Sequence, residues 1–128
     1  VRRDVFMIPP RASWTHSVLD LLPGDTLILF DIRRYENATL LLAEMAHERG
    51  VQVVLFTDQW RSPIQKVAKF TFAARIAVPS AWDSGVALLL LIESIIAKIQ
   101  EDHWETVKAR TDELEAAFDR TRLFRKFT

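Results

Sequence analysis

The sequence contains no cysteine and only three glycines among its 128 residues. The lack of cysteine excludes disulfides, thiol catalysis and cysteine-bound zinc. Three scattered glycines are too few for a P-loop or a dinucleotide-binding fingerprint, since both need several glycines close together. The three histidines, His16, His47 and His103, lack the i, i+4 spacing of a metal site, so we expect no cofactor and no metal ion.

An excess of one charge and a long apolar segment are also missing. The 17 Lys and Arg residues balance the 17 Asp and Glu residues, which excludes the basic excess typical of nucleic-acid-binding domains. The longest apolar run, residues 86–92, is far shorter than a membrane span. The first residues include neither an initiator methionine nor a signal-like segment. We therefore expect a soluble, cytoplasmic chain without membrane contact, cut from a longer protein.

The order of apolar and amphipathic segments predicts a single α/β domain. Strand-like apolar runs alternate with helical periodicity, which is typical of a three-layer α/β fold with a mostly parallel sheet, here of about four strands. The expected strands cover residues 4–8, 26–30, 51–57 and 70–78. The expected helices cover residues 14–22, 38–49, 63–69, 81–100 and 104–122. We place the domain at residues 1–102 and a C-terminal helical extension at residues 103–128.

Local signals refine these boundaries. Gly50 is expected just past a helix C-terminus, and Ser62-Pro63 is a strong helix start. Ser80 and Asp83 have the spacing of a capping box. The strand at 26–30 is a continuous apolar run, which predicts burial on both faces. The helix at 81–100 is apolar nearly all round, so we expect it to pack on the sheet and to contact a partner subunit.

The loop after residue 30 has the charges of an anion site. In parallel α/β folds ligands bind beyond the carboxyl ends of the strands. Asp31, Arg33 and Arg34 occupy such a position, and the helix that begins near Asn37 points its free N–H groups there. The alternative is that the two arginines are surface charges, or pair with Asp31 and Glu36.

Two more strand-end positions join this loop in the predicted site. Thr57 ends the next expected strand, and Ser84 lies near the start of the apolar helix, where capping explains Ser80 and Asp83 but not Ser84. Trp60 is compatible with a lid or an interface. The expected ligand-binding residues are Asp31, Arg33, Arg34, Asn37, Thr57 and Ser84.

Four blocks of the sequence resemble a known family. They are PGDTLILFDIRRY at 23–35, ERGVQVVLFTD at 48–58, Ser62-Pro63 and Asp83-Ser84. In this order and spacing they resemble the SIS (sugar isomerase) domain of RpiR-type transcriptional regulators over about residues 5–100. The resemblance implies a flavodoxin-like parallel sheet that binds phosphosugars, preceded by a helix-turn-helix DNA-binding domain.

The chain departs from this family pattern in two ways. Where the family commonly has Ser-x-Ser-Gly-x-Thr around the sugar phosphate, residues 31–36 read DIRRYE, so arginines would replace hydroxyl groups with bidentate contacts. The family's first strand, with its loop and helix, has no counterpart here, so a pocket formed by this chain alone would be incomplete.

These observations give one main hypothesis and two alternatives. We expect a ligand-sensing, dimerising domain of an RpiR-like regulator that binds a small anionic metabolite such as a sugar phosphate, is not an enzyme, and reaches DNA only through a missing N-terminal domain. One alternative is a sugar-phosphate isomerase, for which His16 and Glu36 are the plausible bases. The other is an oligomerisation module with a decayed pocket.

Overall fold

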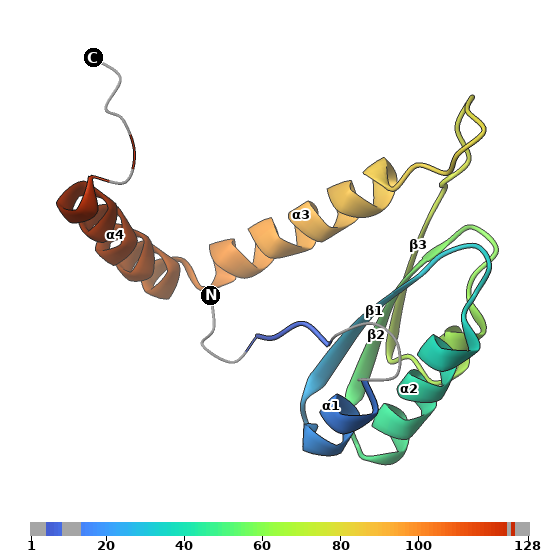
Figure 1. Cartoon of the computed structure of the whole chain (residues 1–128). Helices are drawn as coiled ribbons and strands as arrows, with labels where there is room; N and C mark the ends of the chain where they lie inside the picture. Colours follow the sequence, from blue (N-terminus) through green and yellow to red (C-terminus); the bar gives the residue numbers. More distant parts are fainter. Residues whose placement is uncertain (1–4, 9–13, 123, 125–128) are drawn as a thin grey trace. The chain divides into compact units, whose positions relative to one another are not determined.

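The structure is a computed structural model that describes residues 5–8, 14–122 and 124 (Figure 1). Its elements, in chain order, are α1 (Trp14–Asp20), β1 (Thr26–Asp31), α2 (Asn37–Glu48), β2 (Gln52–Asp58), the 3-10 helix η2 (Pro63–Lys66), β3 (Phe70–Ala74), α3 (Val86–Asp102) and α4 (Trp104–Thr121). The chain forms two compact units, one of Phe6–Leu91 and one that contains the C-terminal part from Ile92 onward.

The first unit contains a parallel sheet with the strand order β1-β2-β3. Leu29 pairs with Leu55, and Phe56 pairs with Phe72, so β2 is the central strand. Because neighbouring parallel strands need crossover connections, α2 and η2 lie between them in the sequence. The predicted α/β fold with a parallel sheet is confirmed.

The strand expected at residues 4–8 is not formed where the structure describes it. Val5–Ile8 has no strand conformation, and Asp4 lies outside the described residues. Val5, Phe6 and Met7 are exposed, and of these four residues Ile8 alone packs against the core, so little apolar burial holds this segment against the sheet. The described sheet therefore has three strands instead of four. Ser13, the expected cap of the first helix, also lies outside the described residues.

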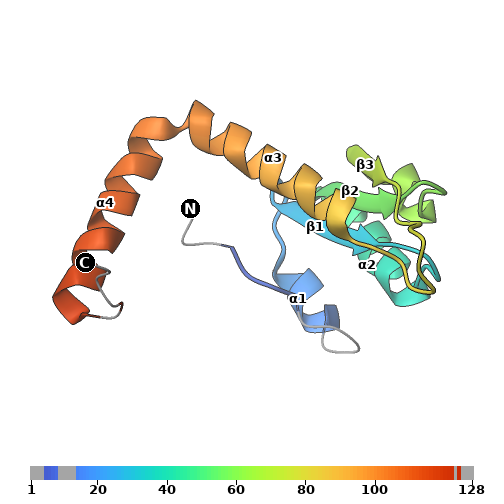
Figure 2. The ribbon, with the colours of Figure 1, turned by 90° about the horizontal axis from the view of Figure 1, so that it is seen from above.

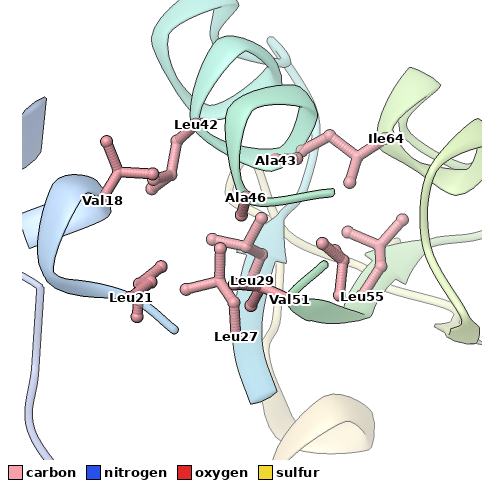
Figure 3. Close-up of a cluster of buried hydrophobic side chains, with 11 residues drawn as sticks. Val18, Leu21, Leu27, Leu29, Leu42, Ala43, Ala46, Val51, Leu55 and Ile64 are labelled. Carbon is pink, nitrogen blue, oxygen red and sulfur yellow. The ribbon is translucent and has the colours of Figure 1, made fainter. Parts of the chain in front are cut away.

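Helices α1 and α2 cover one face of the sheet (Figure 2). Leu27 and Leu29 of β1 point into this layer with Val53 and Leu55 of β2. Figure 3 shows the helical residues of the same cluster, which are Val18, Leu42, Ala43, Ala46 and Ile64. Burial of each large aliphatic side chain contributes about 1.5–3 kcal/mol, so this layer fixes the positions of the strand ends.

The opposite face of β1 is exposed, which corrects the expectation that this strand is buried on both faces. Ile28 and Phe30 are each 54% exposed. The rings of Phe30, Phe56 and Phe72 stack across the three strands with centroids 5.1 Å apart. Ile28 and Phe30 are exposed because β1 lies at the edge of the sheet and because α1 and α2 cover the opposite face, that of Leu27 and Leu29.

The turn from α2 into β2 confirms the role expected for Gly50. Its φ is +77°, its N–H donates to the His47 carbonyl, and the next N–H, of Val51, donates to the Ala46 carbonyl. These two bonds form a Schellman motif, which favours glycine at this position. A Cβ at Gly50 would also lie 3.3 Å from Cβ of Pro23.

Helix α3 begins at Val86, five residues later than expected, and Ser80 and Asp83 do not form a capping box. Ser80 Oγ accepts a hydrogen bond from Trp82 N–H, while Asp83 pairs with Arg33. The N–H of Ser84 donates to the carbonyl of the buried Ile76, which follows the end of β3. These bonds hold residues 79–85 out of a helix. Within the described residues, no helix is long and apolar enough to cross a membrane.

Candidate functional site

Three loops meet beyond the carboxyl ends of the strands. They are the β1–α2 loop (residues 32–36), the β2–η2 loop (59–62) and the β3–α3 segment (75–85), and Figure 1 shows them at the same end of the sheet. The backbone N–H of Arg33 donates to the carboxylate of Asp58, and the guanidinium of Arg33 forms an ion pair with Asp83. These two contacts join the loops directly. The loops that carry the predicted site residues therefore lie at one edge of the sheet.

The carboxylate of Asp58 is the centre of this arrangement. It is fully buried at the end of β2 and accepts four hydrogen bonds. Its Oδ2 accepts from the Arg33 N–H at 2.7 Å, and its Oδ1 accepts from the Tyr35 hydroxyl at 2.6 Å. Oδ1 also accepts from the N–H groups of Trp60 and Arg61, at 3.0 and 3.1 Å. Asp58 therefore ties the β1–α2 loop to the β2–η2 loop.

These contacts change the pKa values of both side chains. Burial by itself would raise the pKa of Asp58, but the hydrogen bonds from Tyr35 and from the three backbone N–H groups outweigh it and hold that pKa below its usual range. Burial, followed by the hydrogen bond to Asp58 and the negative charge of that carboxylate, raises the pKa of Tyr35 to about 12. The pair is therefore an ionised carboxylate and a neutral phenol at neutral pH.

Arg33 and Arg34 share an uncommon backbone conformation. Their φ angles are +35° and +47°, in the left-handed region that residues other than glycine seldom adopt. Arg61, across from them, has a φ of +63°. A strained conformation persists where surrounding contacts determine it. Here Asp58 supplies those contacts, since it accepts from the N–H groups of Arg33 and Arg61.

The side chain of Arg33 has two partners in other loops. Its Nε lies 2.7 Å from Oδ2 of Asp83, and its guanidinium carbon lies 5.0 Å from the centre of the Trp60 ring. The expected alternative partners, Asp31 and Glu36, are therefore wrong for Arg33. Arg34 is exposed and forms no ion pair with any residue that the structure describes.

Asp31 and Thr57 lie beneath this surface. Both are buried, and the Thr57 hydroxyl donates to the Asp31 carbonyl at 2.7 Å. The carboxylate of Asp31 accepts from the hydroxyl of Ser62, and Ser62 Oγ in turn accepts from the Ile64 N–H at the start of η2. The capping role expected for Ser62 is confirmed. The Thr57 hydroxyl also accepts from the Ser62 N–H at 3.0 Å. Asp31 and Thr57 therefore support the loops from below, through one side-chain contact to Ser62 and two contacts to the backbone.

Asn37 and Ser84 lie nearer the surface. Asn37 is exposed at the first position of α2, whose N-cap residue, Glu36, makes no side-chain capping bond. Ser84 Oγ accepts from the Val86 N–H at 3.4 Å, so this hydroxyl has a local role at the start of α3 that the sequence did not indicate. The structure thus places Arg33, Arg34 and Asn37 on one loop and its helix, with Asp83 next to Ser84 bonded to that loop.

Four residues that shape the site are absent from the set of predicted ligand-binding residues. They are Tyr35, Asp58, Trp60 and Asp83. The available signal was Asp58, a carboxylate that directly follows Thr57 at the end of a buried strand. Its hydrogen-bond partners in the β1–α2 loop are 23 and 25 residues away in the sequence, so local patterns did not reveal them.

A separate groove lies at the opposite ends of the strands. It has a volume of about 410 Å³ and is lined in part by His47, Gln52, Lys66 and Lys69. Lys69 Nζ donates to Gln52 Oε1, so part of its polar lining is already paired. None of the site residues lines this groove. Across the described part of the chain, no group of three or more His, Asp or Glu side chains is arranged to hold a metal ion.

The Asp58–Tyr35 contact predicts an unusual titration. Tyr35 is the sole tyrosine of the chain, and the four tryptophans do not ionise in this range, so the ultraviolet absorbance change on phenol ionisation reports Tyr35. Absorbance recorded in rapid pH jumps, before alkaline unfolding, is expected to give a midpoint near 12. Asp58→Asn removes the negative charge and the charged acceptor but keeps the burial, so the midpoint falls part of the way to 10. Asp102→Asn, an exposed carboxylate on α3, is the matched control and leaves it unchanged. A wild-type midpoint near 10 would contradict the contact.

Comparison with known proteins places the chain in a family. Residues 3–98 match the model of the SIS domain family. The structure is similar to the sugar isomerase domain of an RpiR transcription factor from Sphaerobacter thermophilus, with a TM-score of 0.77 and 25% sequence identity. The match covers 84% of this chain and 60% of that one, and no curated protein matches the chain. Since the family match spans most of the sequence, the chain belongs to the SIS domain family.

Proposed function

We propose that the chain is the ligand-sensing and dimerising part of an RpiR-like cytoplasmic transcriptional regulator, and that its ligand is a small anionic metabolite such as a sugar phosphate. The observation that carries the proposal is the loop held by Asp58, which presents Arg33 and Arg34 beside the N-terminus of α2. The similarity to the sugar isomerase domain of an RpiR transcription factor supports it. DNA contact is assigned to a domain outside this sequence.

The proposed ligand contacts follow from the charges and their exposure. Arg33 and Arg34 supply positive charge. The first N–H groups of α2, which begins at Asn37, add the partial positive charge of the helix N-terminus. Ser84 lies beside Asp83, which bonds to the same loop. Asp31 and Thr57 act from beneath, because their buried groups bond to each other and to Ser62.

We propose a regulator rather than an isomerase because the carboxylates at the strand ends are buried and already accept hydrogen bonds within the protein. Aldose–ketose isomerisation needs a base that can take a proton from a carbon atom. Asp58 accepts four hydrogen bonds and has a lowered pKa, and Asp31 is buried against Ser62. Glu36 is exposed and makes no capping bond that would orient it. A sensor needs none of these groups as a base, since it requires binding alone.

Ligand binding predicts a thermal shift that depends on the two arginines. At a hundredfold excess over its dissociation constant, a bound sugar phosphate stabilises the fold by roughly 2.7 kcal/mol, which raises Tm by several degrees. Differential scanning fluorimetry with hexose and pentose phosphates measures this. Arg33→Gln with Arg34→Gln is expected to abolish the shift, while the ligand-free Tm changes little because both side chains are exposed.

The control is Arg110→Gln on α4, an exposed arginine with an ion pair to Glu113, which keeps the shift. A sugar phosphate that stabilises the wild type and the double variant equally would place the ligand elsewhere. A double variant that unfolds without ligand would show that the arginines are structural.

The dimerising role rests on the exposed apolar side of α3. In a monomer, a large apolar surface on one helix is typical of an interaction site. Leu88 is buried within the chain, but five other apolar residues of α3 are 48–72% exposed. They are Val86, Leu89, Leu90, Ile96 and Ile99.

Light scattering at micromolar concentration is therefore expected to give the mass of a dimer, the commonest symmetric assembly. Leu89→Glu with Leu90→Glu places charges on this surface and is expected to give a folded monomer. Gln100→Glu, at an exposed polar position of the same helix, is expected to remain dimeric. A monomeric wild type, or a double variant that keeps the dimer mass, would contradict this interface.

A further inference from the structure

The guanidinium of Arg33, which the proposed function assigns to an anionic ligand, already has an acidic partner in the chain. Asp83 Oδ2 lies 2.7 Å from Arg33 Nε. The side chain of Arg33 is 49% exposed and that of Asp83 is 29% exposed. A carboxylate at this distance neutralises much of the positive charge that a second anion would meet. Asp83 and the ligand therefore compete for the same group.

Arg33 is the fixed member of this ion pair. Its backbone N–H donates to the buried Asp58, and its guanidinium stacks over the ring of Trp60. Both contacts hold the loop and the side chain where the β1 strand ends. An anion that binds Arg33 thus finds the guanidinium already in place.

Asp83 belongs to a projecting segment with fewer attachments. The base of this segment is closed where Ser84 N–H donates to the carbonyl of Ile76, and the Ile76 N–H donates to Gln59 Oε1. Between these two anchors, residues 78–83 are exposed. Asp83 is the residue that links this exposed stretch to the β1–α2 loop.

We propose that Asp83 is a built-in competitor for the ligand: it occupies Arg33 until an anion displaces it, and its displacement frees residues 77–83. The inference rests on the proposed function, since it concerns the same anion site. Asp83 precedes the first residue of α3 by three positions, so its release changes the segment that leads directly into the helix proposed for self-association. Ligand affinity and the start of α3 are thereby coupled through one ion pair.

The test is a calorimetric titration of the full chain with inorganic phosphate at constant ionic strength. Exposed ion pairs are weak, so Asp83→Asn is expected to tighten phosphate binding by about two- to fivefold. Asp102→Asn removes an equal charge from an exposed ion pair on α3, and it is expected to bind phosphate as the wild type does. Arg33→Gln is expected to lose binding.

Hydrogen exchange of residues 77–85 gives an independent readout. Exchange is expected to rise in Asp83→Asn without phosphate, and in the wild type when phosphate is added. If Asp83→Asn binds phosphate no more tightly than the wild type while Arg33→Gln still loses binding, the competition is wrong and the proposed ligand site stands. Phosphate binding that survives Arg33→Gln, or its absence from every variant, contradicts the site and the competition together.

Discussion

A single buried carboxylate determines the geometry of the strand-end loops. Asp58 lies at the end of the central strand, where the core on the helical face fixes the backbone. Its carboxylate accepts hydrogen bonds from four donors. Leaving a buried carboxylate unpaired costs several kcal/mol, so the two loops must close around it. The left-handed backbone at Arg33 and Arg61, whose N–H groups both donate to Asp58, follows from that closure. The positions of the charged side chains on the surface are thus a consequence of a buried group.

The parts of the fold that could be predicted from the sequence are those determined by interactions between residues close together in the chain. Apolar runs and helical periodicity predicted β1, α2, β2 and α4, because each element is defined by neighbours in the sequence. Gly50 and Ser62 were interpreted correctly, since a Schellman motif and a helix cap each involve only a few consecutive residues. The resemblance to the SIS domain of RpiR-type regulators identified the family that the comparison confirms.

The parts that were not predictable depend on contacts between distant segments. The spacing of Ser80 and Asp83 fits a capping box, but Asp83 pairs with Arg33, fifty positions earlier, and α3 starts later as a result. Tyr35 and Asp58 come together only when β1 and β2 pair in register. In the same way, the exposed face of β1 follows from its place at the sheet edge, which its apolar sequence does not encode.

The arrangement of the site is the basis for proposing a sensor and not a catalyst. A catalyst needs a base that can reach the reacting carbon, whereas Asp31 and Asp58 are both buried, and the hydrogen bonds to Asp58 lower its pKa. The groups left at the surface, Arg33 and Arg34, are suited to pairing with an anion and not to accepting a proton from carbon. The arginines also stand where the family commonly has small hydroxyl residues and glycine, so we propose that the ligand is selected by charge more than by close contact with the backbone.

The proposed function requires that an anion binds at the edge of the sheet that Asp58 organises. Backbone amide chemical shifts of the isotope-labelled chain, followed during a titration with a sugar phosphate, test it most directly. The shifted amides are expected to cluster at residues 31–38, 58–61 and 82–86. Shifts confined to the groove of His47, Lys66 and Lys69 at the other end of the strands, or no shifts with any sugar phosphate, would contradict it.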